Sequence, residues 1–188
     1  MEIITKSELR LQYPEILQRI KDGAVFIHPS DTIYGLSCNA LSSQAVQKLR
    51  RLKDRATNPF SVWVPSIDWI SKNCKMSGKS AVWLKELPGP YTIVTQLHNK
   101  KAVATEVIPA VKTLGVRLPN HWFHKIVQDL DFPIVTTSVN KSGQPFMTSL
   151  EDLDADIQAG VDFIVYEGKK PGKPSKIINV VENRVVRE

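Results

Sequence analysis

The sequence of 188 residues predicts a single α/β domain, and three observations support this prediction. Segments with helical periodicity alternate with short apolar runs rich in β-branched residues, which is typical of layered helices and strands. The composition is 42% hydrophobic and 23% charged, which is enough apolar material for one continuous core. The strongest breaks, residues 88–90 and 169–174, precede strand-like sequence, so we expect loops there and one domain over residues 1–188.

The chain opens with a predicted helix and a predicted strand. A Thr-x-x-Glu capping box begins at Thr5, and apolar residues then recur on one face, so we expect a helix over residues 6–21. Residues 24–28 are a short apolar run bounded by turn residues. They predict a buried strand that ends at Pro29.

A second helix follows, capped by Ser42 or Ser43. Its apolar residues fall on one side, and we expect Arg50 and Arg51 to face elsewhere. Lys53 lies where this helix ends.

Two further helices and six strands are expected in the rest of the chain. Residues 120–130 begin with a good cap and have apolar residues at helical spacing, and residues 148–158 begin with a second Thr-x-x-Glu box. Short β-branched and aromatic runs predict strands at residues 60–64, 91–97, 114–118, 133–137, 163–166 and 177–181.

The charge and the apolar segments limit the class of protein. A formal net charge of +6 favours polyanionic partners, which include nucleotide triphosphates as well as RNA. No segment approaches the roughly 20 apolar residues needed to cross a bilayer, and the amino terminus lacks a signal-peptide pattern. We therefore expect a cytoplasmic protein without membrane contact. Cys38 and Cys74 lack zinc-site spacing and are expected to be reduced structural thiols.

Well-known ligand motifs are missing from the sequence. It has no Walker-type phosphate loop, no Gly-x-Gly-x-x-Gly loop and no His-Glu-x-x-His helix, so any nucleotide site must be built differently. His121 and His124 are three residues apart on a predicted helix, but no further ligand is evident near them. We therefore expect no metal site made by the protein alone.

Cations and hydroxyl groups occur instead at predicted strand and helix ends, where open α/β sheets usually bind ligands. Thr32 can hydrogen-bond a small polar ligand and Tyr34 offers a ring and a hydroxyl, although a plain structural turn has equal standing. Lys53 and Arg55 can converge on phosphate oxygens or merely complement the helix dipole. Arg117 lies within an otherwise apolar strand and requires an anionic partner.

A last polar segment extends from residue 133 to residue 149. A predicted strand runs into Ser138 and Asn140, and Thr148 follows at a predicted helix start. Helix starts suit anions, although Thr148 can also serve simply as a cap.

The order and wording of these segments resemble the YrdC/TsaC family of threonylcarbamoyl-AMP synthases from about residue 6 to residue 187. Each motif is weak alone, but their joint occurrence is highly specific. The matching motifs are PSDTIYGL at residues 29–36, Lys53-Asp54-Arg55, Asn58-Pro59, Pro-Gly-Pro-Tyr-Thr at residues 88–92, Val116-Arg117-Leu118-Pro119 and Ser138-Val139-Asn140-Lys141-Ser142-Gly143.

The resemblance implies a YrdC/RibB-like fold, with a twisted mixed sheet flanked by helices around a central cavity. It also implies an L-threonylcarbamoyladenylate synthase, a nucleotidyltransferase that serves threonylcarbamoyladenosine modification of tRNA. By position, the resemblance implies substrate binding by Thr32, Tyr34, Arg117, Ser138 and Ser175. ATP-binding positions are Lys53, Arg55, Asn58, Thr113, Asn140, Thr148 and Arg187, of which Lys53 and Arg55 are the expected catalytic cations.

Three positions depart from the family pattern. The Lys-x-Arg segment lacks the usual following proline and is one residue shorter before Asn58. Trp63 stands where many relatives have a histidine, and Lys176 replaces a threonine after Ser175. The details of the threonine pocket depend on these positions.

In the implied reaction, the amine of threonine takes up carbon dioxide from bicarbonate. The carbamate oxygen then attacks the α-phosphorus of ATP and releases pyrophosphate. Lys53, Arg55 and Arg117 would offset the repulsion between the two anions. We expect Mg²⁺ to arrive on the triphosphate, helped by Asp31.

The resemblance also implies handover of the product to a downstream tRNA threonylcarbamoyl-transferase complex, and it leaves direct contact with tRNA open. Two alternatives remain at this point. One is an RNA-binding module of the same fold without this activity. The other is a carbamoyl-adenylate enzyme with a different acceptor.

Overall fold

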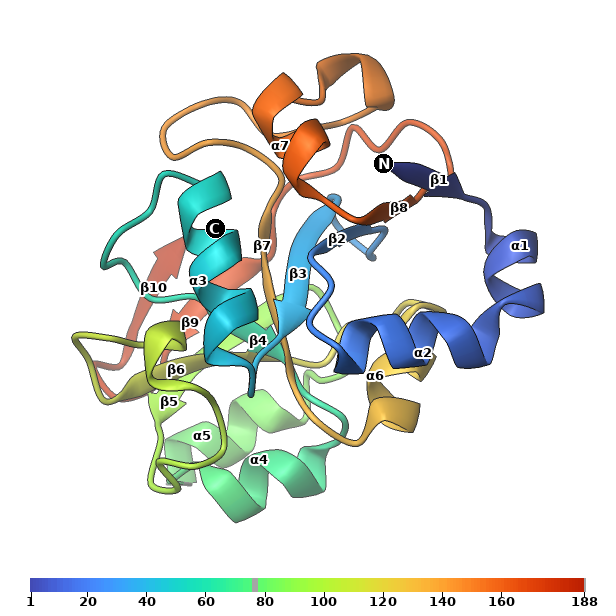
Figure 1. Ribbon diagram of the computed structural model, residues 1–188. Coiled ribbons are helices and arrows are strands. Elements are labelled where there is room, and N and C mark those ends of the chain that lie inside the picture. The colour runs from blue at the N-terminus through green and yellow to red at the C-terminus, as the bar shows by residue number, and fades with distance from the viewer. Residues whose placement is uncertain (76–77, 188) are drawn as a thin grey trace.

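One mixed sheet runs through the protein in the computed structural model, which describes residues 1–75 and 78–187 (Figure 1). Its strands are β1 (Glu2–Ile4), β2 (Phe26–His28), β3 (Gly35–Asn39), β4 (Ser61–Trp63), β5 (Tyr91–Gln96), β6 (Thr113–Arg117), β7 (Ile134–Ser138), β8 (Phe163–Val165), β9 (Lys176–Asn179) and β10 (Arg184–Arg187). Their order across the sheet is β1-β8-β2-β3-β7-β4-β6-β5-β9-β10. Parallel pairs such as β4 with β6 occur beside antiparallel pairs such as β3 with β7, which confirms the expected mixed sheet.

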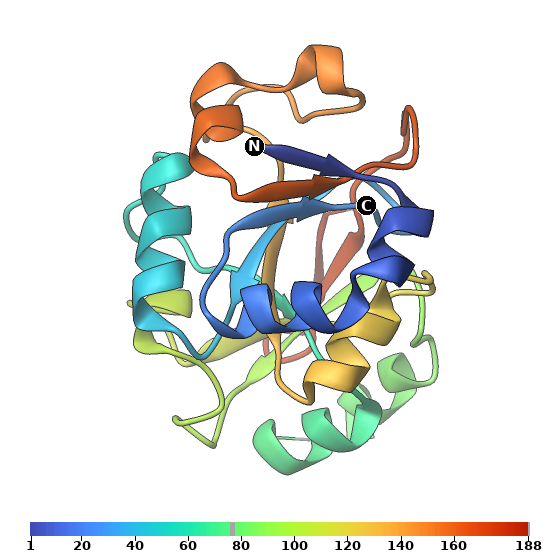
Figure 2. The same cartoon turned by 45° about the vertical axis from the view of Figure 1, so that its right-hand side comes forward.

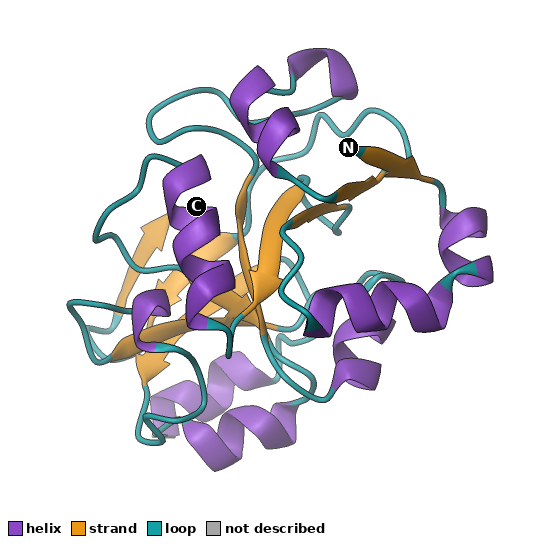
Figure 3. Cartoon of the chain, viewed as in Figure 1, coloured by secondary structure: helices purple, strands orange, loops and turns teal. Residues whose placement is uncertain are grey.

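Helices flank this sheet (Figure 3). They are α1 (Lys6–Leu11), α2 (Tyr13–Lys21), α3 (Ser43–Leu52), α4 (Ile67–Asn73), α5 (Gly78–Leu84), α6 (His124–Leu130) and α7 (Ala155–Gly160), with short 3-10 turns η1 (Thr105–Val107) and η2 (Leu150–Asp152). Figures 1 and 2 show α2 and α6 side by side. The Tyr13 hydroxyl donates to Asp129 at 2.7 Å between these helices. No helix in the described residues is long and apolar enough to cross a membrane.

The central strands bury both faces, because neighbouring residues belong to two different cores. Phe26 packs with the helices α1, α2 and α6, whereas Ile27 packs with α3. The pairs Val62 with Trp63 and Ile134 with Val135 divide in the same way. Successive side chains of a strand point to opposite faces, so both faces of this sheet are covered.

The predicted first helix is wrong in one respect, because the structure has two helices there. The Thr5 capping box is present, but α1 ends at Leu11, and α2 begins at Tyr13 after a non-helical Gln12. Pro14 lacks a backbone N–H and its ring clashes with the carbonyl four residues earlier, so a continuous helix is disfavoured. The chain turns at Gln12, and α2 starts with proline in its first turn.

Two other predicted helices begin later than expected. The first starts at His124 rather than residue 120, and the Asn120 N–H donates to Asp31 instead. In the second, Thr148 does not cap a helix, because its hydroxyl donates to Asp152. Asp154 caps α7 by accepting from two backbone N–H groups.

The expected strands all lie where predicted to within a few residues, but β1, β3 and β10 were not predicted, nor were α4 and α5. Cys38 and Cys74 are free and buried, as expected.

His28 in β2 is a fully buried titratable group. Its Nδ1 atom lies 2.9 Å from the Pro29 carbonyl, which only accepts, so Nδ1 carries the hydrogen. Nε2 then accepts from the Ser37 hydroxyl at 2.7 Å. The ring stacks on Phe123 at 4.6 Å between centroids, and burial lowers the pKa of His28 to about 3.

We expect this histidine to make the protein less stable as the pH falls from about 6.5 toward 3. The unfolded chain binds a proton at His28 in this range and the folded chain does not, so the free energy of unfolding falls by up to about 1.4 kcal/mol per pH unit. Urea unfolding at several pH values would measure this slope. His28→Gln should flatten it and the exposed His98→Gln should not; an unchanged slope in His28→Gln would contradict the assignment.

Candidate active site

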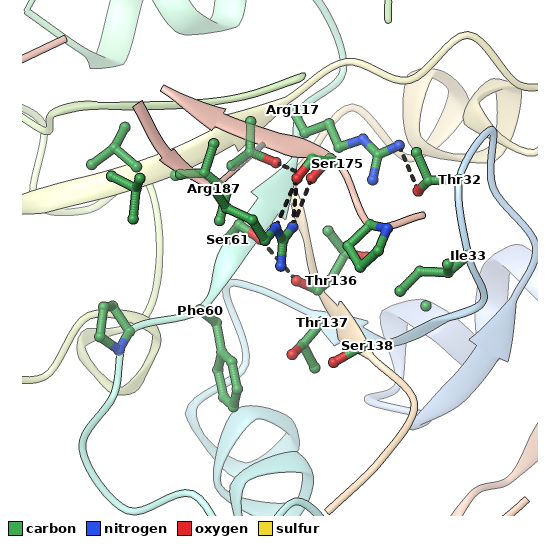
Figure 4. Close-up of a pocket in the computed structure, with 18 of the residues that line it drawn as sticks. Thr32, Ile33, Phe60, Ser61, Arg117, Thr136, Thr137, Ser138, Ser175 and Arg187 are labelled. Atoms are coloured by element: carbon green, nitrogen blue, oxygen red, sulfur yellow. Dashed lines mark hydrogen bonds between the residues drawn. The ribbon is translucent and has the colours of Figure 1, made fainter. Parts of the chain in front are cut away.

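A cavity of about 470 Å³ opens against the middle of the sheet (Figure 4). Its wall includes residues of β3, β4, β5, β6, β7, β9 and β10, together with the segment after β2, the loop after α3 and the segment before β9. Its polar lining is mainly hydroxyl groups and four arginines, namely Arg55, Arg117, Arg184 and Arg187. A hollow with this lining suits a ligand that carries several negative charges.

The structure gathers eight predicted site residues around this cavity. They are Thr32, Tyr34, Arg55, Thr113, Arg117, Ser138, Ser175 and Arg187. Four others do not line it, namely Lys53, Asn58, Asn140 and Thr148.

Arg117 ends β6 and faces the segment that follows β2. Its Nη2 atom donates to the Asp31 carboxylate and, at 3.0 Å, to the Thr32 hydroxyl (Figure 4). Asp31 is the anionic partner that a charge within an apolar strand requires. The Nε atom of Arg117 is buried and has no hydrogen-bond partner among the described residues. Arg117 lines the cavity, so its guanidinium is placed to meet an anionic group on a ligand.

Ser175 and Arg187 meet on the opposite side of the cavity from the Ser138 end of β7. The Arg187 guanidinium donates to the Ser175 carbonyl at 2.7 and 2.9 Å and to its hydroxyl at 3.2 Å (Figure 4). The Ser175 hydroxyl also lies 2.8 Å from that of Thr92. Arg187 thus lines the cavity from β10, a strand that the sequence did not predict. Its contact with ATP stays a prediction.

Residues 167–175, which we call the strap, pack against the segment that carries Thr32. A side chain on Gly172 would lie 2.2 Å from the Thr32 carbonyl, so the two backbones pass in close contact. Lys170 Nζ donates to the Ser30 carbonyl at 2.9 Å. This lysine-rich segment is a loop, as expected, and these contacts hold it against residues 30–32.

Tyr34 holds the strap rather than offering its hydroxyl to the cavity. The hydroxyl donates to the Gly168 carbonyl at 2.6 Å and accepts from the Glu167 N–H at 3.1 Å. The ring stacks on Tyr166 at 5.6 Å and lines the cavity. The expected hydrogen bond from Tyr34 to substrate therefore finds its hydroxyl already engaged.

Arg55 enters the cavity from the loop after α3. Its Nη2 atom donates to the Pro59 carbonyl at 2.7 Å, and its guanidinium lies over the Phe60 ring at 5.0 Å. The Asn58 carbonyl accepts a hydrogen bond from Arg55 Nε. Asn58 is exposed and does not line the cavity.

Lys53 is enclosed by the segment that follows β7. The side chain is 1% exposed, and Nζ donates to the Ser138 carbonyl at 2.6 Å and to the Asn140 carbonyl at 2.7 Å and side-chain oxygen at 2.9 Å. The same Asn140 oxygen accepts from the Ser138 hydroxyl at 2.6 Å. Burial lowers the pKa of Lys53 to about 7. Lys53 thus fixes the Ser-x-Asn segment, and its expected contact with phosphate stays a prediction.

The comparison with family models decides the relationship of this chain to known proteins. A model for the Sua5/YciO/YrdC proteins, described as "Telomere recombination", matches residues 18–188. The chain belongs to the Sua5/YciO/YrdC family.

Members of the Sua5/YciO/YrdC family resemble this chain over most of its length. A Methanocaldococcus jannaschii protein with the provisional name threonylcarbamoyl-AMP synthase is 33% identical over 95% of this chain and 86% of its own length. The structure of Pyrococcus abyssi Sua5 complexed with L-threonine has a TM-score of 0.84 and 26% identity, and it covers 98% of this chain. This chain spans 55% of that longer protein. Escherichia coli YciO shares the fold, with a TM-score of 0.84 at 19% identity, over 100% of this chain and 94% of its own.

Relatives in the Sua5/YciO/YrdC family named threonylcarbamoyl-AMP synthase carry the name of a nucleotidyltransferase-type enzyme.

Three side chains at or beside the cavity were not expected from the sequence: Arg184, Phe60 and Arg50. Arg184 lies on β10, and the pair of β-branched valines between two arginines in RVVR is the signal that was available. Arg50 was expected to face away from the core, but it is buried.

No group of three or more potential metal ligands occurs among the described residues of this Sua5/YciO/YrdC chain. Asp31 was expected to help magnesium, but its carboxylate accepts from Arg117 and from the Asn120 N–H at 3.1 Å. These residues do not fit a metal site made by the protein.

Proposed function

We propose that this chain is an L-threonylcarbamoyladenylate synthase, which makes threonylcarbamoyl-AMP and pyrophosphate from L-threonine, bicarbonate and ATP. One observation carries the proposal: a single cavity combines Thr32, Arg117 and Ser175 with the further arginines Arg55 and Arg187. The similarity to a Sua5 structure that holds L-threonine supports threonine as the amino acid.

Arg117 and Thr32 are the groups best placed to bind the amino acid. The Arg117 guanidinium lines the cavity and is oriented by Asp31 and Thr32, so it suits the α-carboxylate of threonine. Ser138 and Ser175 supply hydroxyl groups on other walls of the same cavity. Binding there would leave the amine free to take up carbon dioxide as a carbamate.

The remaining arginines are suited to the nucleotide. A carbamate oxygen would form a bond to the α-phosphorus while the bond from that phosphorus to the pyrophosphate oxygen breaks, so pyrophosphate leaves with the electron pair. Arg55 and Arg187 would offset the repulsion between the two anions and stabilise charge on the leaving group. The chain would act mainly by positioning both reactants in this one cavity.

Mg²⁺ belongs to this proposal as part of the bound triphosphate, and no step depends on a protein ligand for it. The product would serve threonylcarbamoyladenosine formation in tRNA after transfer to a cytoplasmic tRNA threonylcarbamoyl-transferase complex.

An omission assay tests the proposed function. Pyrophosphate release from ATP would be followed with L-threonine and bicarbonate supplied together or withheld one at a time, and mass spectrometry would identify the nucleotide product. We expect release only when both are present, with a product of the mass of threonylcarbamoyl-AMP. Release without threonine would favour another acceptor, and RNA binding without any release would favour a non-enzymatic module.

A further inference from the structure

A buried arginine lies behind the loop that brings Arg55 into the cavity. Arg50 comes from the last turn of α3, is 9% exposed and does not line the cavity. Its hydrogen bonds go to backbone carbonyl oxygens rather than to carboxylates. Arg50 therefore stabilises the backbone conformation of the segments around it.

One edge of the Arg50 guanidinium donates hydrogen bonds to the backbone carbonyls of the loop after α3. Nη1 donates to the carbonyls of Arg55 at 2.9 Å, Ala56 at 3.1 Å and Asn58 at 3.1 Å. Nη2 donates to the Asn58 carbonyl again at 3.2 Å. Three carbonyls within four residues thus converge on one side chain, which fixes the direction of the backbone at each of them.

The other donors of Arg50 tie this loop to a second segment. Nε donates to the Glu106 carbonyl at 2.7 Å and Nη2 to the Val107 carbonyl at 3.4 Å. The Phe60 N–H donates to the same Val107 carbonyl at 2.9 Å, and the guanidinium lies 4.4 Å from the Phe60 ring centre. Arg50 therefore joins the loop, the η1 turn and the aromatic wall of the cavity.

The loop needs such a partner because residues 53–60 form neither helix nor strand. Carbonyl groups in irregular backbone that are turned away from water require a hydrogen-bond donor. A planar guanidinium offers five donors in a fixed fork, whereas a lysine ammonium is a point charge on a flexible stem. The arrangement therefore depends on arginine and not on positive charge alone.

We propose that Arg50 is a positioning residue, which holds the backbone of residues 55–58 so that Arg55 reaches the phosphates of the nucleotide. Arg50 itself does not touch the substrate. The identity of the ligand in this inference rests on the proposed function.

The kinetic test compares Arg50→Ala, Arg50→Lys and the exposed neighbour Arg51→Ala in the full chain. We expect kcat/KM for ATP to fall about 100-fold in both Arg50 variants, since a displacement of about 1 Å in a positioned group has this effect. KM for threonine should stay within threefold, and Arg51→Ala should stay within twofold in all constants. Millimolar guanidinium chloride should restore part of the turnover of Arg50→Ala and none of that of Arg50→Lys.

Two measurements separate this inference from the proposed function, because neither requires turnover. Hydrogen exchange of residues 54–59 should accelerate in Arg50→Ala while the sheet keeps its protection, and calorimetry should show weaker binding of inorganic pyrophosphate. If the wild type makes no adenylate but these two effects appear, the proposed function fails and the positioning role stands.

The inference would be overturned if a folded Arg50→Ala protein kept its kcat/KM and its pyrophosphate affinity within threefold of wild type. A wild-type protein that does not bind pyrophosphate would also overturn it. If Arg50→Ala does not fold, Arg50→Lys decides the matter by the same criteria.

Discussion

Replacing Lys53 by methionine is expected to lower turnover by about two orders of magnitude, which corresponds to about 3 kcal/mol of transition-state stabilisation. The ammonium holds the Ser138 and Asn140 carbonyls and the Asn140 side chain together, and methionine supplies no donor to any of them. Ser138, which lines the cavity, would then lose its fixed position. Pyrophosphate release at saturating threonine, bicarbonate and ATP measures the effect.

A matched control for Lys53→Met is Lys48→Met on the same helix. Lys48 forms an ion pair with Asp162 at 2.9 Å that is partly exposed, so its loss should change turnover less than twofold. Circular dichroism would show whether both variants keep their fold. Near-normal turnover in a folded Lys53→Met protein would remove Lys53 from the mechanism.

Replacing Arg117 by glutamine is expected to affect both stability and threonine use. The substitution leaves the Asp31 carboxylate partly buried without its cation, which costs about 3–5 kcal/mol for such pairs. It also removes the guanidinium assigned to the threonine carboxylate. We expect kcat/KM for threonine to fall about 100-fold, as found for the loss of a preorganised donor.

A second substitution separates these two effects of Arg117. Adding Asp31→Asn removes the unpaired charge, so the double variant should regain most of the lost stability in urea unfolding. It should regain none of the threonine-dependent turnover. A double variant with normal kcat/KM for threonine would show that Arg117 only supports the fold.

The sequence predicted the part of the site that resides at strand ends. Arg117 was identified because a charge within an apolar strand needs a partner, and Asp31 proves to be that partner. Ser175 and Arg187 came from the family resemblance, and they meet across β9 and β10. Such residues are predictable because strand ends and their motifs are local features.

The place of Lys53 at a helix end does not predict where it lies relative to the cavity. The helical spacing does predict that Lys53 is on the buried side of the helix. Val46, Leu49, Arg50 and Lys53 stand at positions i, i+3, i+4 and i+7, so all four share the buried side of α3 and its C-cap. The prediction that Arg50 faces away from the apolar side did not take this helical spacing into account. Which carbonyls these cations would meet depends on loops distant in sequence, and local patterns do not contain that information.

The missed strands have physical reasons of their own. Residues 35–39 read GLSCN, and glycine, serine and asparagine are poor strand formers by themselves. Pairing with β2 on one side and β7 on the other makes β3 a strand in spite of this composition. Its burial is complete, so tertiary pairing and not local preference determines its structure.

The pairing of β1 with β8 has a consequence for how the chain is made. Glu2 lies opposite Phe163, and β2 also takes β8 as its neighbour, so β1 and β2 both wait for a strand that is synthesised much later. Contacts this distant in sequence form slowly, and the unpaired strand edges stay open to other chains meanwhile. On the ribosome, this end of the sheet would remain unpaired until residues 163–165 had emerged, so we expect translation products that stop before them to be prone to aggregation.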